Sequence, residues 1–134
     1  MELNKITHFD LFSGFGGFTL ACESFGIKTI GFSEIDKYAN AVLKYHYPNI
    51  KNYGDITKII PEELPDFDLL TFGSPCQDLS IAKKNREGLS GERSGLFYKA
   101  VEILKVKKPK YFVMENVASM SKENKDIISQ ILGV

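Results

Sequence analysis

The chain has 134 residues with 17 basic and 17 acidic side chains, so its net charge is zero and does not by itself indicate a nucleic-acid partner. Its 43% hydrophobic content is enough for the core of one domain, which we expect over residues 1–134. Cys22 and Cys76 make no disulfide framework, and neither a signal peptide nor a membrane-spanning apolar run is found, so we expect a cytoplasmic protein with reduced thiols.

The first half of the chain alternates between apolar strands and helices. Strands are predicted at residues 6–12 and 29–33, helices at 18–25 and 36–47, and a short strand or turn at 52–56. The first helix follows a glycine turn and stops before a further glycine. Its apolar residues share one face: Phe18, Ala21, Cys22 and Phe25.

The second half of the chain continues this alternation. It has a connector or single helical turn at 61–65, a strand at 67–72, a polar loop at 83–95, a helix at 95–107, a strand at 111–114 and a final helix from Ser121. Strands that alternate with helices predict an α/β fold, with a parallel sheet of about five strands and helices on both faces.

Cys76 lies in a stretch that follows the predicted buried strand at 67–72. Open α/β sheets bind their ligands at the carboxyl ends of strands, which favours a functional thiol at this position. Pro75 fixes its own φ and holds the preceding residue extended, so the thiol is carried on a stiffened backbone. The alternative is that Cys76 is a small buried hydrophobic residue.

The turn Gly14-Phe15-Gly16-Gly17 joins the first strand to the first helix. Glu34 follows Gly14 by twenty residues and ends the second strand, where such folds place an acid on a ribose diol. Asp55 could accept from an adenine amino group, so together these residues favour an adenosine-containing ligand. The alternatives are an ordinary glycine turn, a solvated carboxylate and a turn aspartate. No Walker lysine follows the glycines.

Glu115 and Asn116 end the strand at 111–114, where partial burial can raise a carboxyl pKa and allow proton donation. The alternative is a surface or capping acid. Lys83 and Arg93 belong to a basic loop that could close over an anionic polymer, although charge runs are usually solvated. Zinc-ligand spacing is missing, so we expect no metal.

Three motifs together resemble the DNA cytosine-5 methyltransferase family. They are Asp10-Leu11-Phe12-Ser13-Gly14-Phe15-Gly16-Gly17, then Gly73-Ser74-Pro75-Cys76-Gln77, then Glu115-Asn116-Val117. They occur in the family's order, with Glu34 and Asp55 in step between them, and the similarity covers residues 6–134. The resemblance implies a Rossmann-like S-adenosylmethionine-dependent fold and double-stranded DNA as the substrate.

The resemblance also implies residue roles. Cys76 would attack C6 of a flipped cytosine, and Glu115 would bind its N3 edge. The residues implied for S-adenosylmethionine are Asp10, Phe12, Gly14, Gly16, Gly17, Glu34, Ile35, Asp55, Ile56, Pro75 and Leu96. The residues implied for DNA are Gln77, Ser80, Lys83, Arg93, Asn116 and Val117.

The family's arginine-containing motif, target-recognition region and closing carboxyl-terminal segment have no counterpart in this sequence. The sheet is therefore expected to lack its last two strands, leaving the strand at 111–114 as an apolar edge. We expect a fragment or split subunit that needs a second polypeptide, or self-association through that edge. The alternatives are a catalytically silent relative that binds cofactor or a partner, and a nicotinamide-dependent oxidoreductase.

Overall fold

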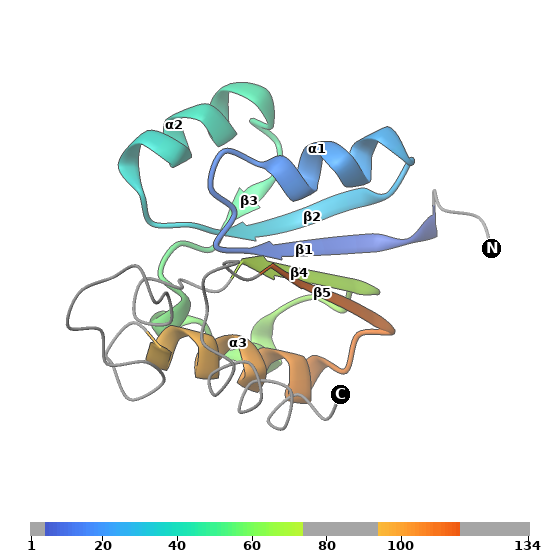
Figure 1. Ribbon diagram of the computed structural model, residues 1–134, viewed down its shortest axis with the longest axis vertical. Helices are drawn as coiled ribbons and strands as arrows, with labels where there is room; N and C mark the ends of the chain where they lie inside the picture. The colour runs from blue at the N-terminus through green and yellow to red at the C-terminus, as the bar shows by residue number, and fades with distance from the viewer. Residues whose placement is uncertain (1–4, 74–93, 116–134) are drawn as a thin grey trace.

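Figure 1 shows a computed structural model of the chain, which describes residues 5–73 and 94–115. The elements are β1 (Thr7–Leu11), α1 (Gly17–Ser24), β2 (Lys28–Ser33), α2 (Lys37–His46), β3 (Lys51–Asn52), the 3₁₀ turns η2 (Ile56–Lys58) and η3 (Pro61–Glu63), β4 (Leu69–Gly73), α3 (Ser94–Lys107) and β5 (Tyr111–Glu115). The predicted strands and helices up to residue 114 are confirmed to within two residues, except that 52–56 holds the end of β3 and the start of η2. The predicted loop at 83–95 lies almost entirely outside the described residues. The helix predicted from Ser121 lies outside the described residues.

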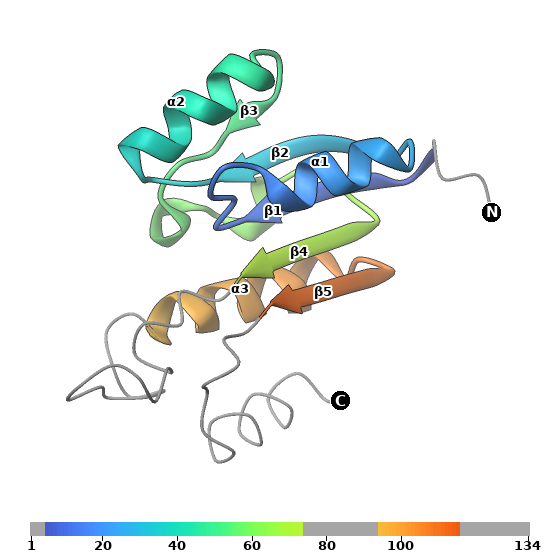
Figure 2. The same ribbon diagram turned by 45° about the horizontal axis from the view of Figure 1, so that its top comes forward.

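The five strands form one parallel sheet in the order β3-β2-β1-β4-β5. Leu11 at the end of β1 pairs with Ser33 on one side and with Phe72 on the other. Figures 1 and 2 show α1 and α2 on one face of the sheet and α3 on the other. The parallel α/β architecture is therefore confirmed, and it aligns the carboxyl ends of the strands at one edge.

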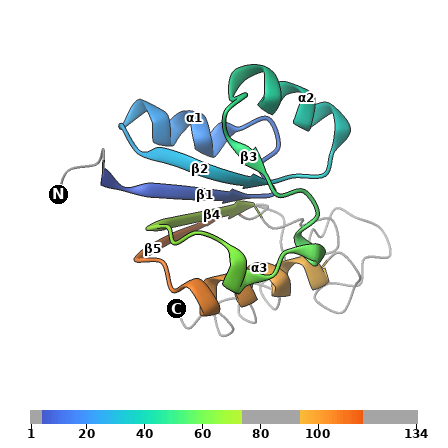
Figure 3. The same ribbon diagram turned by 180° about the vertical axis from the view of Figure 1, so that it is seen from behind.

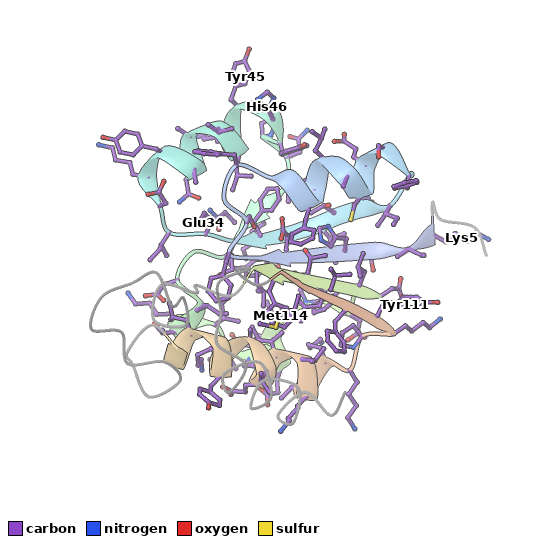
Figure 4. All side chains as sticks on the ribbon, in the orientation of Figure 1. Lys5, Glu34, Tyr45, His46, Tyr111 and Met114 are labelled. Atoms are coloured by element: carbon purple, nitrogen blue, oxygen red, sulfur yellow. The ribbon has the colours of Figure 1, made fainter. Side chains whose placement is uncertain are left out.

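The face of the sheet toward α3 holds the main apolar core. Phe9 and Leu11 project from β1 into this layer with Leu70 and Phe72 of β4, and all four are fully buried. Met114 of β5 packs against the same layer, between the sheet and α3 in Figure 4. Burying each of these side chains contributes about 2 kcal/mol, so this layer is what fixes α3 against the sheet.

The opposite face is polar under α1. His8 and Asp10 alternate with Phe9 along β1 and therefore point to this side, where both are fully buried. The sheet-facing position of α1 is taken by Thr19, at 1% exposure, because its hydroxyl donates to Asp10. Phe25, which shares the expected apolar face, is 66% exposed.

Within the described ranges, β5 lies at one edge of the sheet and β3 at the other. Figure 3, from behind, shows the short β3 beside β2. No helix in residues 5–73 or 94–115 is both long and apolar enough to cross a membrane.

Gly31 is predicted to be the least replaceable glycine of the sheet. It pairs with Phe9, and an added Cβ would lie 2.5 Å from Phe9 Cε2 and 3.1 Å from Tyr53 Cε1. Because the Phe9 ring is fully buried, we expect Gly31→Ala to lower the free energy of unfolding by about 2 kcal/mol in urea titrations. Gly17→Ala, with no atom within 4 Å of its Cβ, is the control. Equal stability of the two variants would contradict this packing.

Candidate functional site

A cavity of about 570 Å³ opens at the carboxyl ends of β1 and β2, a size that suits a small-molecule ligand. Its walls combine apolar side chains with three carboxylates. The lining residues are Phe12, Ser33, Glu34, Ile35, Asp36, Lys37, Gly54, Asp55, Ile56 and Leu96. Residues from β2, α2, η2 and α3 and from the turn after β1 therefore meet in one place, although they are up to 84 positions apart, from 12 to 96.

Six of the residues predicted to bind the cofactor line this cavity: Phe12, Glu34, Ile35, Asp55, Ile56 and Leu96. Asp10 is buried beneath the glycine turn, and Gly14, Gly16 and Gly17 form that turn without lining the cavity. Pro75 lies outside the described residues. The sequence did not identify Ser33, Asp36, Lys37 and Gly54, although each is within two positions of a predicted residue.

The glycine turn is held open by its backbone conformation and by Glu34. Phe12, Gly14 and Gly16 have φ of 54°, 57° and 91°, so the turn uses the left-handed region repeatedly. The Gly14 N–H donates to Glu34 Oε1 at 2.8 Å. Because Glu34 follows β2, this bond fastens the turn after β1 to the end of the neighbouring strand (Figure 4).

Glu34 also organises the start of α2. Its Oε2 accepts from the backbone N–H groups of Ile35 at 2.9 Å and Asp36 at 2.8 Å. A carboxylate offers about four lone-pair sites, and three are occupied by backbone N–H groups. The remaining site, on Oε1, can accept a hydroxyl hydrogen from a ligand in the cavity.

Asp55 is both an N-cap and part of the cavity wall. Its Oδ1 accepts from the Thr57 N–H at 2.9 Å and the Thr57 hydroxyl at 2.7 Å. These hydrogen bonds hold the pKa of Asp55 below its usual value, so the group is ionised at neutral pH. Among the described residues, Oδ2 has no hydrogen-bond partner and is available to a donor on a ligand.

Asp36 and Ser33 explain how the missed residues fit the site. Asp36 is the N-cap of α2, where its side chain accepts from the Ala39 N–H at 2.7 Å. Ser33 Oγ donates to the Gly54 carbonyl at 2.8 Å and so joins the end of β2 to the turn before Asp55. The sequence indicated Asp36 as an acid at the start of the predicted helix. It could not indicate that Asp36 lines the same cavity as Gly54 and Asp55, because that depends on the tertiary fold.

A buried polar cluster lies beneath the glycine turn and consists of His8, Asp10, Thr19, Thr29 and Thr71. All five side chains are at most 7% exposed. Burial raises the pKa of Asp10 to about 6, against the lowering effect of its hydroxyl donors. Burial also lowers the pKa of His8 to about 4, so His8 is neutral near pH 7.

The two strands that precede the predicted catalytic residues end at this same edge of the sheet. β4 ends at Gly73 and β5 at Glu115, and these two residues pair with each other. Cys76 follows three residues after Gly73 but lies outside the described residues, as do Gln77, Ser80, Lys83, Arg93, Asn116 and Val117. Glu115 is placed here by its backbone only. No group of three metal-ligating side chains occurs in the part of the chain that the structure describes.

Comparison with known proteins gives this geometry a context. The model of the family described as C-5 cytosine-specific DNA methylase matches residues 6–133. The orphan methyltransferase M.SPRI of Bacillus phage SPR is 42% identical over 127 residues, which are 92% of this chain and 29% of that protein. The type II methyltransferase M.HhaI of Haemophilus parahaemolyticus is 40% identical over 120 residues, which are 90% of this chain and 36% of that protein.

Solved structures agree on the fold. The crystal structure of S. pombe Dnmt2 methyltransferase superposes with a TM-score of 0.74 at 23% identity and covers 96% of this chain and 42% of that one. This likeness confirms the predicted Rossmann-like fold. The chain spans about a third of the length of these relatives.

The buried pair of His8 and Asp10 predicts an unusual dependence of stability on pH. The His8 pKa falls from 6.5 to about 4 on folding, which costs stability as the pH drops. The Asp10 pKa rises from 3.8 to about 6, which adds stability as the pH drops through that value. Each displacement corresponds to about 3 kcal/mol, so the two effects cancel between about pH 4 and 6.

Single variants should expose the two opposing slopes. We expect Asp10→Asn to lose stability relative to the wild type on acidification through this window, and His8→Phe to gain stability relative to the wild type. The measurement is the free energy of unfolding in urea at several pH values. Parallel pH profiles for the wild type and both variants would contradict the assignment.

Proposed function

The chain belongs to the family of C-5 cytosine-specific DNA methylases, and we propose that it forms the cofactor-binding and catalytic part of a DNA cytosine-5 methyltransferase. The reaction would transfer a methyl group from S-adenosylmethionine to C5 of a cytosine in double-stranded DNA. One observation carries the proposal: the cavity lined by Phe12, Glu34 and Asp55 opens at the sheet edge where Gly73 pairs with Glu115.

The cavity fits S-adenosylmethionine in size and in chemistry. Glu34 retains one acceptor site for a ribose hydroxyl, and Asp55 Oδ2 can accept from the adenine amino group. Phe12, Ile35 and the other apolar lining residues suit the faces of the adenine ring. When bound, the cofactor supplies an electrophilic methyl group.

The proposed chemistry at the base uses Cys76 and Glu115. The C5 carbon of cytosine is a poor nucleophile, so the Cys76 thiolate would add to C6 and turn C5 into an enamine-like carbon. Glu115 would bind N3 and the exocyclic amine, and a proton at N3 would neutralise the negative charge that develops there. After methylation, loss of the C5 proton would let the C6–S bond break and free the thiolate.

Access to the base requires that the cytosine leave the duplex, because C6 cannot be reached within the stack. We infer that Asn116 and Val117 assist Glu115 at the base. Gln77 and Ser80 would fill the gap or contact the DNA backbone, and Lys83 and Arg93 would lie near phosphates. The cytoplasm, where DNA is accessible in a bacterial cell, is the proposed place of action.

We propose that the activity needs the remaining length of the relatives, either in the same polypeptide or in a second one. The matched regions are 29% and 36% of the two curated relatives. The edge position of β5 within the described sheet supports pairing of that strand with a further segment or a second copy. Sequence-specific recognition of DNA would belong to that additional part.

Cofactor binding is tested by Asp55→Asn. Asparagine keeps an oxygen for the Thr57 cap but places an amide donor where the adenine amino group would bind. We expect S-adenosylmethionine to bind about tenfold more weakly by calorimetry, the loss of about 1.4 kcal/mol. The control is Asp66→Asn, because the Asp66 side chain is 98% exposed, pairs with Lys107 and lies outside the cavity lining. Equal weakening in both variants would remove Asp55 from the proposed site.

Catalysis is tested by trapping on duplex DNA that contains 5-fluorocytosine, because fluorine at C5 blocks release of the thiolate. The chain is incubated with this DNA and tritiated S-adenosylmethionine, alone and with the part of the phage relative that it does not match. We expect a covalent, labelled complex in the second mixture, and none with Cys76→Ser. Cofactor binding without trapping in either mixture would favour a catalytically silent relative, and no cofactor binding would overturn the proposal.

A further inference from the structure

The buried polar cluster forms one continuous line of hydrogen bonds across three strands. Thr29 Oγ1 lies 2.7 Å from His8 Nδ1, and His8 Nε2 lies 2.6 Å from Thr71 Oγ1. Thr71 Oγ1 lies 2.8 Å from Asp10 Oδ1. The line therefore runs from β2 through β1 to β4 and returns to β1 at a carboxylate.

The number of available hydrogens fixes which atom donates and which accepts in each hydrogen bond of this line. An ionised carboxylate only accepts, so the single hydroxyl hydrogen of Thr71 must go to Asp10. Thr71 Oγ1 must then accept from His8, which requires a hydrogen on Nε2. A neutral imidazole has only one N–H, so Nδ1 is bare and accepts from the Thr29 hydroxyl.

We propose that His8 is a positioning residue, fixed as the neutral Nε2–H tautomer, that orients Asp10 through Thr71. His8 is fully buried as the second residue of β1, where an apolar side chain is usual, and the proposed reaction does not use it. Its two nitrogens satisfy one hydroxyl on each neighbouring strand and leave the Thr71 hydrogen to Asp10 alone.

Orientation of Asp10 matters because this residue supports the glycine turn from below. Its Oδ2 accepts from Thr19 Oγ1 of α1 at 3.1 Å, and its carbonyl accepts from Ser13 Oγ at 2.7 Å. Thr19 and Ser13 lie on the two sides of the turn, which also supplies Phe12 to the cavity. A rotation of the Asp10 carboxylate would break the bond to Thr19 and release one side of the turn.

The titratable groups around the cluster are consistent with this order of hydrogen-bond donors and acceptors. Besides His8, the titratable groups that act on Asp10 or respond to it are Glu34 after β2 and Cys22 of α1. Burial, and then Asp10, raise the pKa of the Cys22 thiol, which stays protonated. In the described part of the chain, no cation among these groups competes with the two hydroxyl donors, Thr19 and Thr71, for the carboxylate.

The tautomer can be read by nitrogen-15 NMR at about pH 7.5, above the Asp10 pKa of about 6. The chain has only two histidines, and the exposed His46 at the end of α2 is the internal control (Figure 4). We expect His8 to show a protonated Nε2 and a bare Nδ1, and to stay neutral to below pH 5. A protonated Nδ1 on His8, or a His8 imidazolium that forms well above pH 5, would overturn the proposal.

Isosteric variants separate positioning from simple packing. We expect Thr71→Val to shift His8 toward the Nδ1–H tautomer, because Nε2 loses its acceptor, and Thr71→Ser to restore the Nε2–H tautomer. Thr29→Val should leave Nε2 protonated, because the acceptor on Thr71 remains. An unchanged tautomer in Thr71→Val would overturn the direction that we assign to the line.

The link to the cavity rests on the proposed function and is measured by S-adenosylmethionine affinity. We expect about tenfold weaker binding in Thr71→Val, recovery in Thr71→Ser and a change below about twofold in Thr29→Val. Equal affinity of the Thr71→Val chain and the wild type would overturn the positioning role. If the wild type does not bind the cofactor at all, the proposed function fails, while the tautomer assignment is still decided by NMR.

Discussion

The parallel pairing of β1 with both β2 and β4 is the constraint on which the rest of the structure depends. Strand β1 is central, and its last residue, Leu11, lies beside Ser33 and Phe72. The chain must therefore leave each strand at the same edge, which brings the glycine turn, Glu34 and Gly73 together. The large apolar side chains on the α3 side hold this register, because a slip of one residue would turn Phe9 and Leu11 toward α1.

The two faces of β1 have different tasks. The apolar face stabilises the fold. The polar face carries a buried carboxylate, which lowers that stability but holds the glycine turn in place. Glu34 completes that fastening from the neighbouring strand by holding the Gly14 N–H. The cavity is thus bounded by loops that are tied to each other through side chains, and a ligand would meet polar groups already in place. Such preorganisation lowers the ordering cost of binding.

Much of this arrangement could be predicted from the sequence. Apolar runs, the glycine turn and the caps gave the strands and helices, and six predicted cofactor residues do meet in one cavity. The contributions of Asp36 and Gly54 to the wall could not be predicted, because they depend on how α2 and η2 approach each other. The sequence also did not predict that Thr19 is buried while Phe25 is exposed. The spacing of apolar residues does not reveal that a buried carboxylate needs a hydroxyl donor at this position. The role of His8 could not be recognised in the sequence, since its hydrogen-bond partners are 21 and 63 positions away.

Thr71 has a position whose meaning extends beyond its hydrogen bonds. It lies two residues before Gly73, so the strand that supports Asp10 is also the strand that leads toward Cys76. Under the proposed reaction, the strand that orients Asp10 beneath the cofactor turn is also the strand from which the chain continues to the nucleophile. Thermal motion of the sheet would carry Asp10 and the end of β4 at Gly73 together. Transfer reactions lose rate when reactants are misplaced by about 1 Å. A strand that is common to the cofactor turn and to the approach to the nucleophile would therefore limit such misplacement without requiring the whole molecule to be stiffer.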